Sequence, residues 1–291
     1  MKVFVTGASG FVGSAVVDEL IKAGHRVIGL ARSDESAKAI GDAGAEVLRG
    51  SLDDLDILKK GASDADGVIH TAFIHDFTQY AKANEADKAA IGAMGEALKG
   101  TNKPLVVTAG VLGLPKTNGF VTEDDAAKDS RRDSEATATA LATGGVNASV
   151  IRLSPSVHDR GDKGFVPFII GQARKNGVSA YVGDGNNRWS AVHRLDAAQL
   201  YRLALEKGAK GTLYNGVADE GITIKQIAEL IGEKLSLPVK SLTVDEAAQH
   251  FEWMTGFITF DNPATSLKTQ SELGWKPQHL GLLEDMEKNY F

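Results

Sequence analysis

The chain has 291 residues, 43% hydrophobic and 24% charged, which suits one large α/β domain or a nucleotide-binding domain with a smaller partner. Its formal net charge is −6 with the acidic residues scattered, so the sequence predicts no nucleic-acid partner. The absence of cysteine excludes disulfides, thiol catalysis and thiolate metal sites, and no metal site is predicted. The first residues show no basic flank before an apolar signal core. No stretch approaches the roughly 18 apolar residues of a membrane span, so a cytoplasmic location away from membranes is expected.

The first half of the chain alternates short apolar, β-branched runs with longer helical patterns. Strands are predicted at residues 2–6, 26–30, 45–48, 67–71, 105–108 and 148–153, and helices at 13–23 and 80–98. Gly24 and Gly100 follow the two helices, as left-handed helix caps commonly do. Continuous apolar strands separated by helices predict a doubly wound, parallel α/β sheet of the Rossmann type. Residues 1–153 are therefore predicted to form a dinucleotide-binding domain.

The later chain has a looser pattern. Helices are predicted at residues 165–175, 196–206, 224–235 and 245–254, and short strands at 179–182, 212–215 and 239–242. There is no internal repeat and no clean linker. Residues 154–291 are therefore expected to complete the Rossmann sheet and to form a small C-terminal substrate lobe.

A glycine-rich turn directly follows the first predicted strand and opens the first helix. It reads Thr6-Gly7-Ala8-Ser9-Gly10-Phe11-Val12-Gly13, with the pattern Gly-x-x-Gly-x-x-Gly. The first glycine permits a tight turn, the second lets backbone amides approach a pyrophosphate, and the third lets the helix pack closely on the strand. The amides from Ser9 to Val12 and the helix dipole would then favour the phosphate charge, with the Ser9 hydroxyl as a further donor. The alternative is a turn whose glycines serve packing alone.

The end of the second strand bears on the choice of cofactor. An NAD site usually carries an acid there for the ribose 2′-hydroxyl, whereas an NADP site uses a cation beside the 2′-phosphate. Here Ala31 stands in the place of the acid, and Arg32 and Ser33 follow it. A guanidinium can bind a phosphate through two hydrogen bonds, which favours NADP(H) over NAD(H). Two alternatives remain: Arg32 is a solvated surface residue, or Asp34 or Glu35 binds the ribose.

These motifs resemble those of the short-chain dehydrogenase/reductase superfamily, specifically its extended and atypical members of the NAD(P)-dependent epimerase/dehydratase type. Gly50-Ser51-Leu52-Asp53 is similar to the Gly-Asp-Leu-x-Asp turn beside the adenine, which adds Ser51 and Leu52 to the cofactor site. Residues 68–72 resemble the fourth strand and the turn under the cofactor, which adds Thr71, Ala72 and Phe73. Residues 188–196 resemble the late Val-His-x-x-Asp segment, where we expect Asp196 to cap a helix. The resemblance implies a sheet of seven or so strands and, by family habit, a homodimer.

The resemblance also points to catalytic positions. Residues 106–113 are similar to the family's fifth strand, where Thr108 falls on the serine that orients the substrate oxygen; the alternative is a strand-end threonine bonded to backbone. The Tyr-x-x-x-Lys pair is missing, because aligning Ser134-Glu135 with the family's Ser-Lys puts Arg131 in place of the tyrosine and Glu135 in place of the lysine. The two either line the nicotinamide pocket or form a solvated pair on one helix face.

The resemblance implies an NADPH-dependent oxidoreductase acting on a carbonyl or activated alkene of a small, partly apolar molecule. His158 and His75 are candidate proton donors, since imidazole titrates near neutrality. The candidate pocket side chains are Phe73, Phe120, Phe165, Trp189 and Trp253. Two alternatives remain: a non-catalytic NADP(H)-binding redox sensor, and an epimerase or dehydratase that retains its cofactor.

Overall fold

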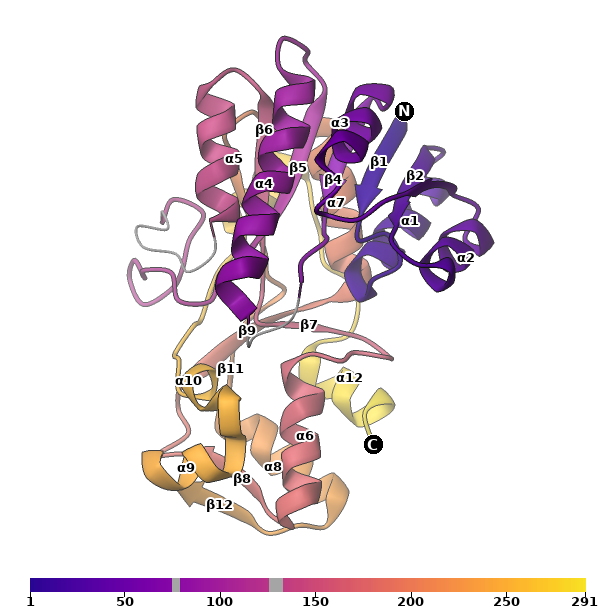
Figure 1. Ribbon diagram of the computed structural model, residues 1–291. Coiled ribbons are helices and arrows are strands. Elements are labelled where there is room, and N and C mark those ends of the chain that lie inside the picture. Colours follow the sequence, from indigo (N-terminus) through magenta and orange to yellow (C-terminus); the bar gives the residue numbers. More distant parts are fainter. Residues whose placement is uncertain (75–78, 126–132) are drawn as a thin grey trace.

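The computed structural model describes residues 1–74, 79–125 and 133–291, and its upper layer is built on one parallel sheet (Figure 1). The seven strands lie in the order β10-β6-β5-β4-β1-β2-β3. Their bounds are β1 Lys2–Thr6, β2 Arg26–Ala31, β3 Glu46–Arg49, β4 Gly67–His70, β5 Pro104–Gly110, β6 Asn147–Leu153 and β10 Leu213–Gly216. The doubly wound Rossmann sheet predicted from the sequence is thereby confirmed.

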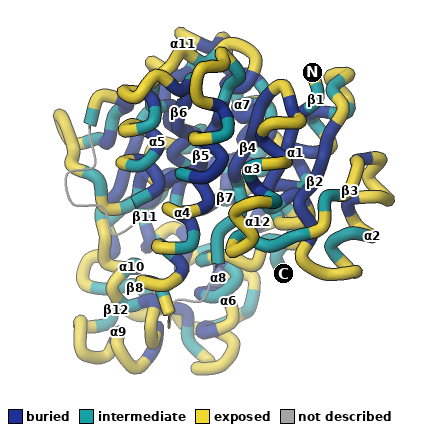
Figure 2. The backbone as a smooth tube through the Cα atoms, turned by 45° about the horizontal axis from the view of Figure 1, so that its top comes forward, coloured by how far each residue is buried: buried dark blue, intermediate teal, exposed yellow. Residues whose placement is uncertain are grey.

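Helices cover both faces of this sheet because its central strands are apolar on both sides. Helices α1 (Phe11–Lys22) and α7 (Arg194–Lys207) pack with the sheet in one hydrophobic core. Helices α3 (Leu55–Asp64), α4 (Tyr80–Leu98) and α5 (Ser134–Thr143) enclose a second core on the opposite face. Figure 2 shows the buried central strands, with β3 and α2 (Asp34–Asp42) at the exposed edge. Among the described residues, no helix is long and apolar enough to cross a bilayer.

A smaller lobe lies below the carboxyl ends of the sheet strands (Figure 1). Its strands form two small sheets, β11-β9-β7 and β12-β8. Their bounds are β7 Ser156–His158, β8 Ser179–Val182, β9 Arg188–His193, β11 Asp219–Thr223 and β12 Val239–Leu242. The helices of the lobe are α6 Phe165–Asn176, α8 Ile224–Leu235, α9 Val244–Phe251, the 3₁₀ turn η2 Glu252–Met254, α10 Thr255–Ile258 and α12 Leu282–Asn289. These elements enclose a third hydrophobic core.

The later chain also returns to the upper layer. Strand β10 pairs in parallel with β6, with Leu213 opposite Val150, and α11 (Leu267–Leu273) packs against α7 and β10. The chain therefore enters the lobe after β6, comes back to complete the sheet, and ends in the lobe at α12 (Figure 1).

Three expectations about individual elements were wrong. The predicted helix 245–254 ends at Phe251, because Glu252 has a positive φ of 52° that a helix cannot accommodate. Strand β5 continues to Gly110, so Thr108 lies two residues inside the strand. Asp196 does not cap α7: the cap is His193, whose Nδ1 accepts a hydrogen bond from the Leu195 amide.

Candidate active site

The glycine-rich turn allows β1, β4 and α1 to approach closely. Gly7 has a φ of +71°, and a Cβ at this position would lie 2.7 Å from the amide nitrogen of Ala72. A Cβ at Gly13 would lie 2.0 Å from the Gly7 carbonyl oxygen, well inside any allowed contact. The Gly10 amide donates to that same carbonyl at 2.8 Å and closes the turn. Two of the three glycines are therefore sterically required.

The beginning of α1 offers backbone donors to an anion. Gly10 is the N-cap residue and supplies no side-chain acceptor, and the first turn contains no acidic residue. Ser9 and Gly10 are exposed, and Phe11 and Val12 are half-buried. The first amides thus lie at an accessible helix N-terminus, whose dipole favours negative charge. This geometry fits the pyrophosphate of a dinucleotide.

A cation from the later chain lies over this turn. The guanidinium of Arg194 stacks on the Phe11 ring, with Cζ 4.8 Å from the ring centroid, and Nη1 donates to the Phe11 carbonyl at 3.3 Å. Asp159 fixes the guanidinium from the other side, with Oδ2 3.1 Å from Nε. No local pattern identifies Arg194, because its partners are far away in the sequence.

The end of β2 lacks an acid and carries cations. Ala31 is buried, Arg32 is exposed, and the hydroxyl of Ser33 caps α2 by accepting from the Ser36 amide at 3.1 Å. Arg49 pairs in register with Ala31 from the adjacent strand, a second cation that sequence reasoning missed. Its guanidinium forms an ion pair with Asp34. Asp34 is therefore already engaged by a cation.

The segment after β3 that is predicted to lie beside the adenine forms a short hydrogen-bonded turn. The amide and the hydroxyl of Ser51 donate to Asp54 Oδ2 at 2.7 and 2.9 Å, and these bonds lower the pKa of the Asp54 carboxyl. Leu52 is half-buried and packs on the second core. Ser51 replaces the family's aspartate and is held in position by Asp54.

The turn after β4 lies against the glycine-rich turn. The Thr71 hydroxyl donates to the Thr6 carbonyl at 2.8 Å, and the Ala72 amide donates to the Thr6 hydroxyl at 3.4 Å. Phe73 follows, with its ring centroid 6.0 Å from that of Tyr80 at the start of α4. The predicted cofactor residues of β1 and β4 are thus brought together.

A buried hydrogen-bonded chain links this region to α5. His70 bonds to the Thr6 hydroxyl through Nδ1 at 2.7 Å and to Asp87 Oδ1 through Nε2 at 3.0 Å. The Ser134 hydroxyl donates to the other Asp87 oxygen. Because an aspartate only accepts, His70 donates from Nε2 to Asp87. The chain rigidly connects the turn of β1 with the first residue of α5.

Thr108 is 6% exposed, and its hydroxyl already has two protein partners. It donates to the His70 carbonyl at 2.6 Å and lies 2.7 Å from the hydroxyl of Tyr201 on α7. This bond to backbone agrees with the alternative stated for a threonine at this strand. The role of Thr108 in orienting a substrate remains a prediction.

Glu135 is buried and holds a guanidinium. Its two oxygens accept from Nε and Nη2 of Arg152 at 2.7 and 2.6 Å, and Arg152 also donates to the Asp125 carbonyl at 2.6 Å. The expected partner Arg131, like His75, lies outside the described residues. The solvated pair considered as an alternative does not fit the buried carboxylate of Glu135.

His158 is fully buried between the two lobes of the molecule. Its Nδ1 lies 2.8 Å from Asp285 Oδ2 on α12, and its ring meets the His193 ring edge-on at 5.4 Å. Within the described part of the chain its Nε2 has no hydrogen-bond partner. Among the described residues, Thr108 contacts His70 and Tyr201, Glu135 contacts Arg152, and His158 contacts Asp285 and His193. A joint role of the three in catalysis remains a prediction.

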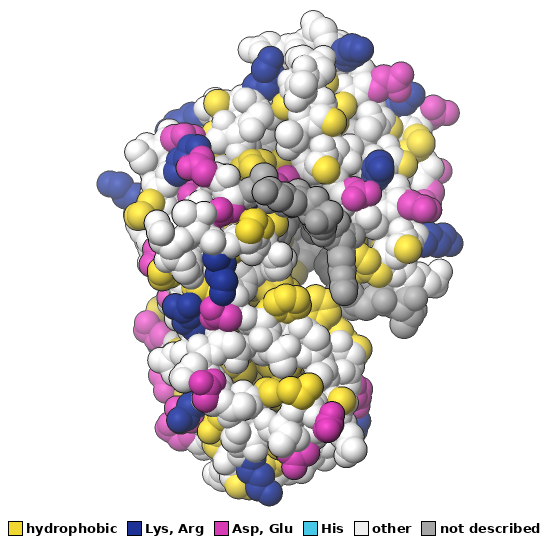
Figure 3. Space-filling model, turned by 90° about the vertical axis from the view of Figure 1, so that its left-hand side faces the viewer, with side chains coloured by type: hydrophobic (Ala, Val, Ile, Leu, Met, Phe, Trp, Pro, Cys, Tyr) yellow, Lys and Arg dark blue, Asp and Glu magenta, His cyan; other side chains and the backbone are white. Residues whose placement is uncertain are grey.

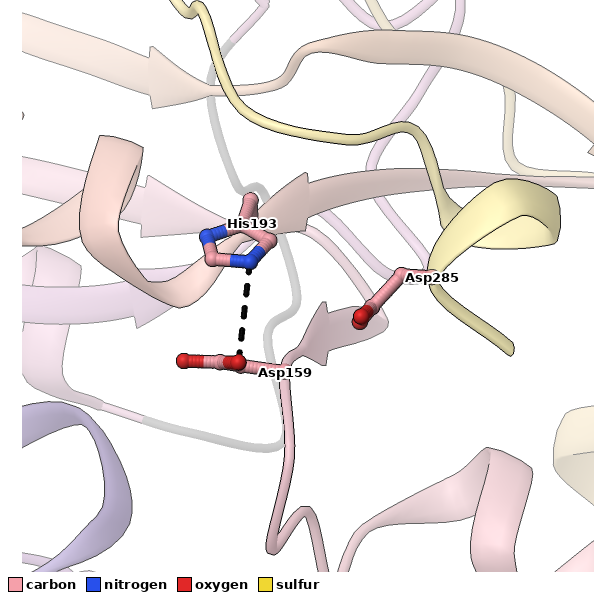
Figure 4. Close-up of side chains that lie close together, drawn as sticks. All are labelled: Asp159, His193 and Asp285. Atoms are coloured by element: carbon pink, nitrogen blue, oxygen red, sulfur yellow. Dashed lines mark ion pairs between the residues drawn. The ribbon is translucent and has the colours of Figure 1, made fainter. Parts of the chain in front are cut away.

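Asp159, His193 and Asp285 converge at the same junction (Figure 4), and their ligand-type atoms lie within 4.8 Å of one another. His193 Nδ1 accepts from the Leu195 amide at 3.2 Å, so the neutral ring carries its proton on Nε2, the atom 3.7 Å from Asp159. A metal would need that Nε2 lone pair. The group therefore fits a polar cluster better than a metal site.

Fold and site together define a Rossmann-type dinucleotide-binding protein with a second lobe over the cofactor edge. The family model of the NAD dependent epimerase/dehydratase family matches residues 3–95. The uncharacterized protein YLL056C of Saccharomyces cerevisiae is 51% identical over 100% of this chain and 99% of its own length. The uncharacterized protein C2A9.02 of Schizosaccharomyces pombe is 47% identical over the full length of both. The chain belongs to the NAD-dependent epimerase/dehydratase family of the short-chain dehydrogenase/reductase superfamily.

More distant relatives have named activities. The 2-alkyl-3-oxoalkanoate reductase of Stenotrophomonas maltophilia is 29% identical over 75% of this chain and 69% of its own. Among solved structures, the dTDP-glucose 4,6-dehydratase DesIV of Streptomyces venezuelae has a TM-score of 0.79 at 18% identity, covering 100% of this chain and 96% of its own. This structural likeness supports the fold.

Proposed function

We propose that the protein binds NADP(H) in preference to NAD(H) and reduces a carbonyl group or an activated alkene of a small, partly apolar molecule. The proposal depends on one observation above all. A sterically tight glycine turn and an accessible helix N-terminus lie at the sheet edge that faces the second lobe. In open α/β sheets, ligands bind outside the carboxyl ends of the strands.

The ribose end of the site supports the preference for NADP(H). Arg32 is exposed beside the strand end, Arg49 lies opposite Ala31, and no acid occupies the Ala31 position. A 2′-phosphate would compete with Asp34 for the Arg49 guanidinium while gaining Arg32. Both contacts are charge-assisted, and guanidinium groups suit phosphate geometry.

Several relatives with named activities are reductases. They include the 2-alkyl-3-oxoalkanoate reductase named above and a farnesyl-dihydroquinoline-oxide ketoreductase of Stigmatella aurantiaca, 24% identical over 74% of this chain. An NADPH-dependent methylglyoxal reductase of Saccharomyces cerevisiae is 39% identical over 27% of the chain and 26% of its own. Each of these activities belongs to the relative, and for this chain reduction is our proposal.

When bound, the nicotinamide cofactor supplies the hydride. The amides at the start of α1 would hold the pyrophosphate, and Arg32 with Arg49 would hold the 2′-phosphate. Water supplies the proton for the substrate oxygen, because His158 is fully buried and its Nδ1 lies 2.8 Å from the Asp285 carboxylate. Thr108 and Arg131 remain candidates for orienting that oxygen.

The test is direct. The protein is incubated with NADPH and a panel of aldehydes, ketones and enones while the nicotinamide absorbance is followed. Turnover of at least one class establishes the reductase. Conversion of a sugar nucleotide without net absorbance change would instead indicate an epimerase or dehydratase with retained cofactor.

Two observations favour a second candidate, a non-catalytic NADP(H)-binding sensor. The residue at the family's lysine position, Glu135, is occupied by Arg152, and the hydroxyl of Thr108 is occupied by Tyr201. Tight NADPH binding without turnover across the whole panel is the outcome that would select this candidate.

A further inference from the structure

Helices α1 and α7 pack side by side on the sheet. Phe11 and Arg194 are their first residues, and the Arg194 guanidinium donates to the Phe11 carbonyl. Further along, the Arg202 guanidinium donates to the Glu19 carboxylate at 2.7 Å. This second contact lies eight residues beyond the first in both helices, about 12 Å along their axes. The helices therefore run parallel, and Arg194 connects their N-termini at one edge of the sheet.

The Arg194 guanidinium is accessible, and the protein does not use all of its donors. The side chain is 24% exposed. Nε and Nη2 lie 3.1 Å from Asp159 Oδ2, and Nη1 donates to the Phe11 carbonyl at 3.3 Å. Nη1 carries two N–H groups, and within the described residues the Phe11 carbonyl is its one acceptor. One N–H of this cation is therefore available beside the first residue of α1.

Two neighbours hold the guanidinium in position. Its Cζ lies over the Phe11 ring, 4.8 Å from the centroid. Asp159 binds it through Oδ2, while Oδ1 of the same carboxylate lies 3.7 Å from His193 Nε2 (Figure 4). An arginine side chain loses about 2 kcal/mol of rotamer entropy when it is immobilised. A guanidinium that the fold already holds has lost much of that freedom before a ligand arrives, which favours binding.

A bound pyrophosphate needs a cation at this position. It is doubly charged, whereas a helix N-terminus is equivalent to roughly half a positive charge. The molecule as a whole does not attract an anion, because its net charge is −6 and Figure 3 shows lysines and arginines interspersed with acidic side chains. In the part of the chain that the structure describes, no lysine or arginine other than Arg194 forms a hydrogen bond or ring contact with residues 7–13.

We propose that Arg194 binds the pyrophosphate of the dinucleotide, together with the backbone amides at the start of α1. Asp159 is a positioning residue that orients the guanidinium. This inference rests on the proposed function, because it takes the start of α1 as the cofactor site and adds a side chain to it. That side chain comes from the second half of the chain, outside residues 3–95, which the family model matches.

The experiment measures, by calorimetry, the binding of two fragments of the cofactor. ADP-ribose contains the pyrophosphate without a 2′-phosphate, and 2′-AMP contains the 2′-phosphate without a pyrophosphate. Arg194→Met should weaken ADP-ribose binding at least about tenfold, as expected for a charge-assisted contact, and leave 2′-AMP within about twofold. Arg32→Ala should show the reverse pattern. Arg194→Lys retains the charge without the planar group and should weaken ADP-ribose binding about threefold, which tests the inference even if Arg194→Met does not fold.

Arg202→Met is the matched control. Arg202 is 20% exposed, belongs to the same helix and also bonds to α1, but lies about 12 Å from the glycine turn. Its substitution should leave ADP-ribose binding within about twofold. The affinity of the unaltered protein for ADP-ribose should also fall more steeply with added salt than that of Arg194→Met, because one ionic contact is missing in the variant.

Two results would overturn the inference. Unchanged ADP-ribose binding in the Arg194 variants would mean that Arg194 does not contact the pyrophosphate. Equal losses for both fragments, or an equal loss in Arg202→Met, would mean that Arg194 serves only the packing of α1 and α7. The proposed function can fail separately: a selective loss of ADP-ribose binding in Arg194→Met, without turnover of any carbonyl compound by the unaltered protein, would uphold Arg194 and overturn the reductase.

Discussion

The carboxylate of Glu135 and the guanidinium of Arg152 form a doubly hydrogen-bonded ion pair beneath α5, with distances of 2.7 and 2.6 Å. In this pair a glutamate stands where the family alignment expects the catalytic lysine. A buried carboxylate that already holds a guanidinium is suited to maintaining the position of α5. We therefore expect the ion pair to contribute mainly to the stability of the fold.

We predict that Glu135→Gln lowers the free energy of unfolding by about 3 kcal/mol or more, because it leaves the Arg152 charge buried without compensation. Urea unfolding measures the loss. Glu284→Gln is the control: Glu284 makes an exposed pair with Lys288 at 2.7 Å, worth less than about 0.5 kcal/mol. If Glu135→Gln unfolds like the control yet abolishes turnover, Glu135 is catalytic and not structural.

Gly13 gives a second prediction. Gly13→Ala should abolish dinucleotide binding, because the new Cβ would lie 2.0 Å from the Gly7 carbonyl and α1 would be pushed away from the turn. Gly92→Ala is the matched control, since Gly92 lies inside α4 with nothing within 4 Å of its Cβ position. That control should gain up to about 1 kcal/mol of stability and keep its affinity. Calorimetric titration with NADPH distinguishes them, and unchanged binding by Gly13→Ala would mean that the turn is not the pyrophosphate site.

Cofactor choice can be tested at the ribose end. Arg32→Ala should weaken NADPH binding roughly ten- to a hundredfold, the value of a charge-assisted pair of about 1.5–3 kcal/mol, and leave NADH nearly unchanged. Asp34→Asn should strengthen NADPH binding, because it releases Arg49 from its ion pair. Ala31→Asp should favour NADH. Equal affinity of the unaltered protein for both cofactors would contradict the proposed preference.

Thr108 and Tyr201 should be substituted together. If their hydroxyls serve the fold, Thr108→Val and Tyr201→Phe each lower stability by about 1 kcal/mol, and the double variant loses less than the sum because the two groups share one hydrogen bond. We expect turnover to stay within a few-fold in both. A large loss of turnover in Thr108→Val alone would instead place its hydroxyl on the substrate.

Stability should fall in mild acid. Burial lowers the pKa of His193 and of His250 below the ordinary value, so the unfolded chain takes up these protons first. The contribution of each histidine is present above about pH 6.5 and is lost as the pH falls below it, at up to about 1.4 kcal/mol per pH unit. Urea unfolding at pH 7.5 and 5.5 should show a shallower decline for His250→Gln. An identical decline in His250→Gln and in the unaltered protein would mean that His250 does not contribute to the loss of stability in acid.

The sheet and the glycine turn could be predicted from the sequence, because both depend on patterns of residues that are close together in the chain. Apolar runs and a fixed glycine spacing predict β1 and the start of α1 without reference to distant residues. The strands β7, β9 and β11 escaped prediction: β7 has only three residues, the sequence of β9 places Arg188, Ser190 and His193 among its apolar residues, and β11 contains no buried residue. Helix α2 escaped for a related reason: only Ile40 in it is buried, so it carries almost no apolar pattern.

The contacts that shape the site were harder to foresee because they join residues far apart in the chain. Arg194 reaches Phe11, and Arg152 reaches Glu135 from another element. Asp196 illustrates the error that results. An acid in the first turn of a helix suggests a cap, but its oxygens bind the amides of Gln278 and His279, both at 3.0 Å, and so anchor the C-terminal segment.

Strand β10 follows the first elements of the lobe in the sequence but belongs to the central sheet. The chain therefore cannot be cut between the sheet and the lobe without removing a strand from the sheet. The sheet strand beside β6 is made only after the chain between Leu153 and Leu213 has been synthesised. Until then β6 presents an open edge of unpaired amides and carbonyls, which favours pairing with another chain. A fragment ending at Leu153 would keep this hazard permanently. An exchange of lobes between relatives must therefore carry β10 and α7 with the sheet.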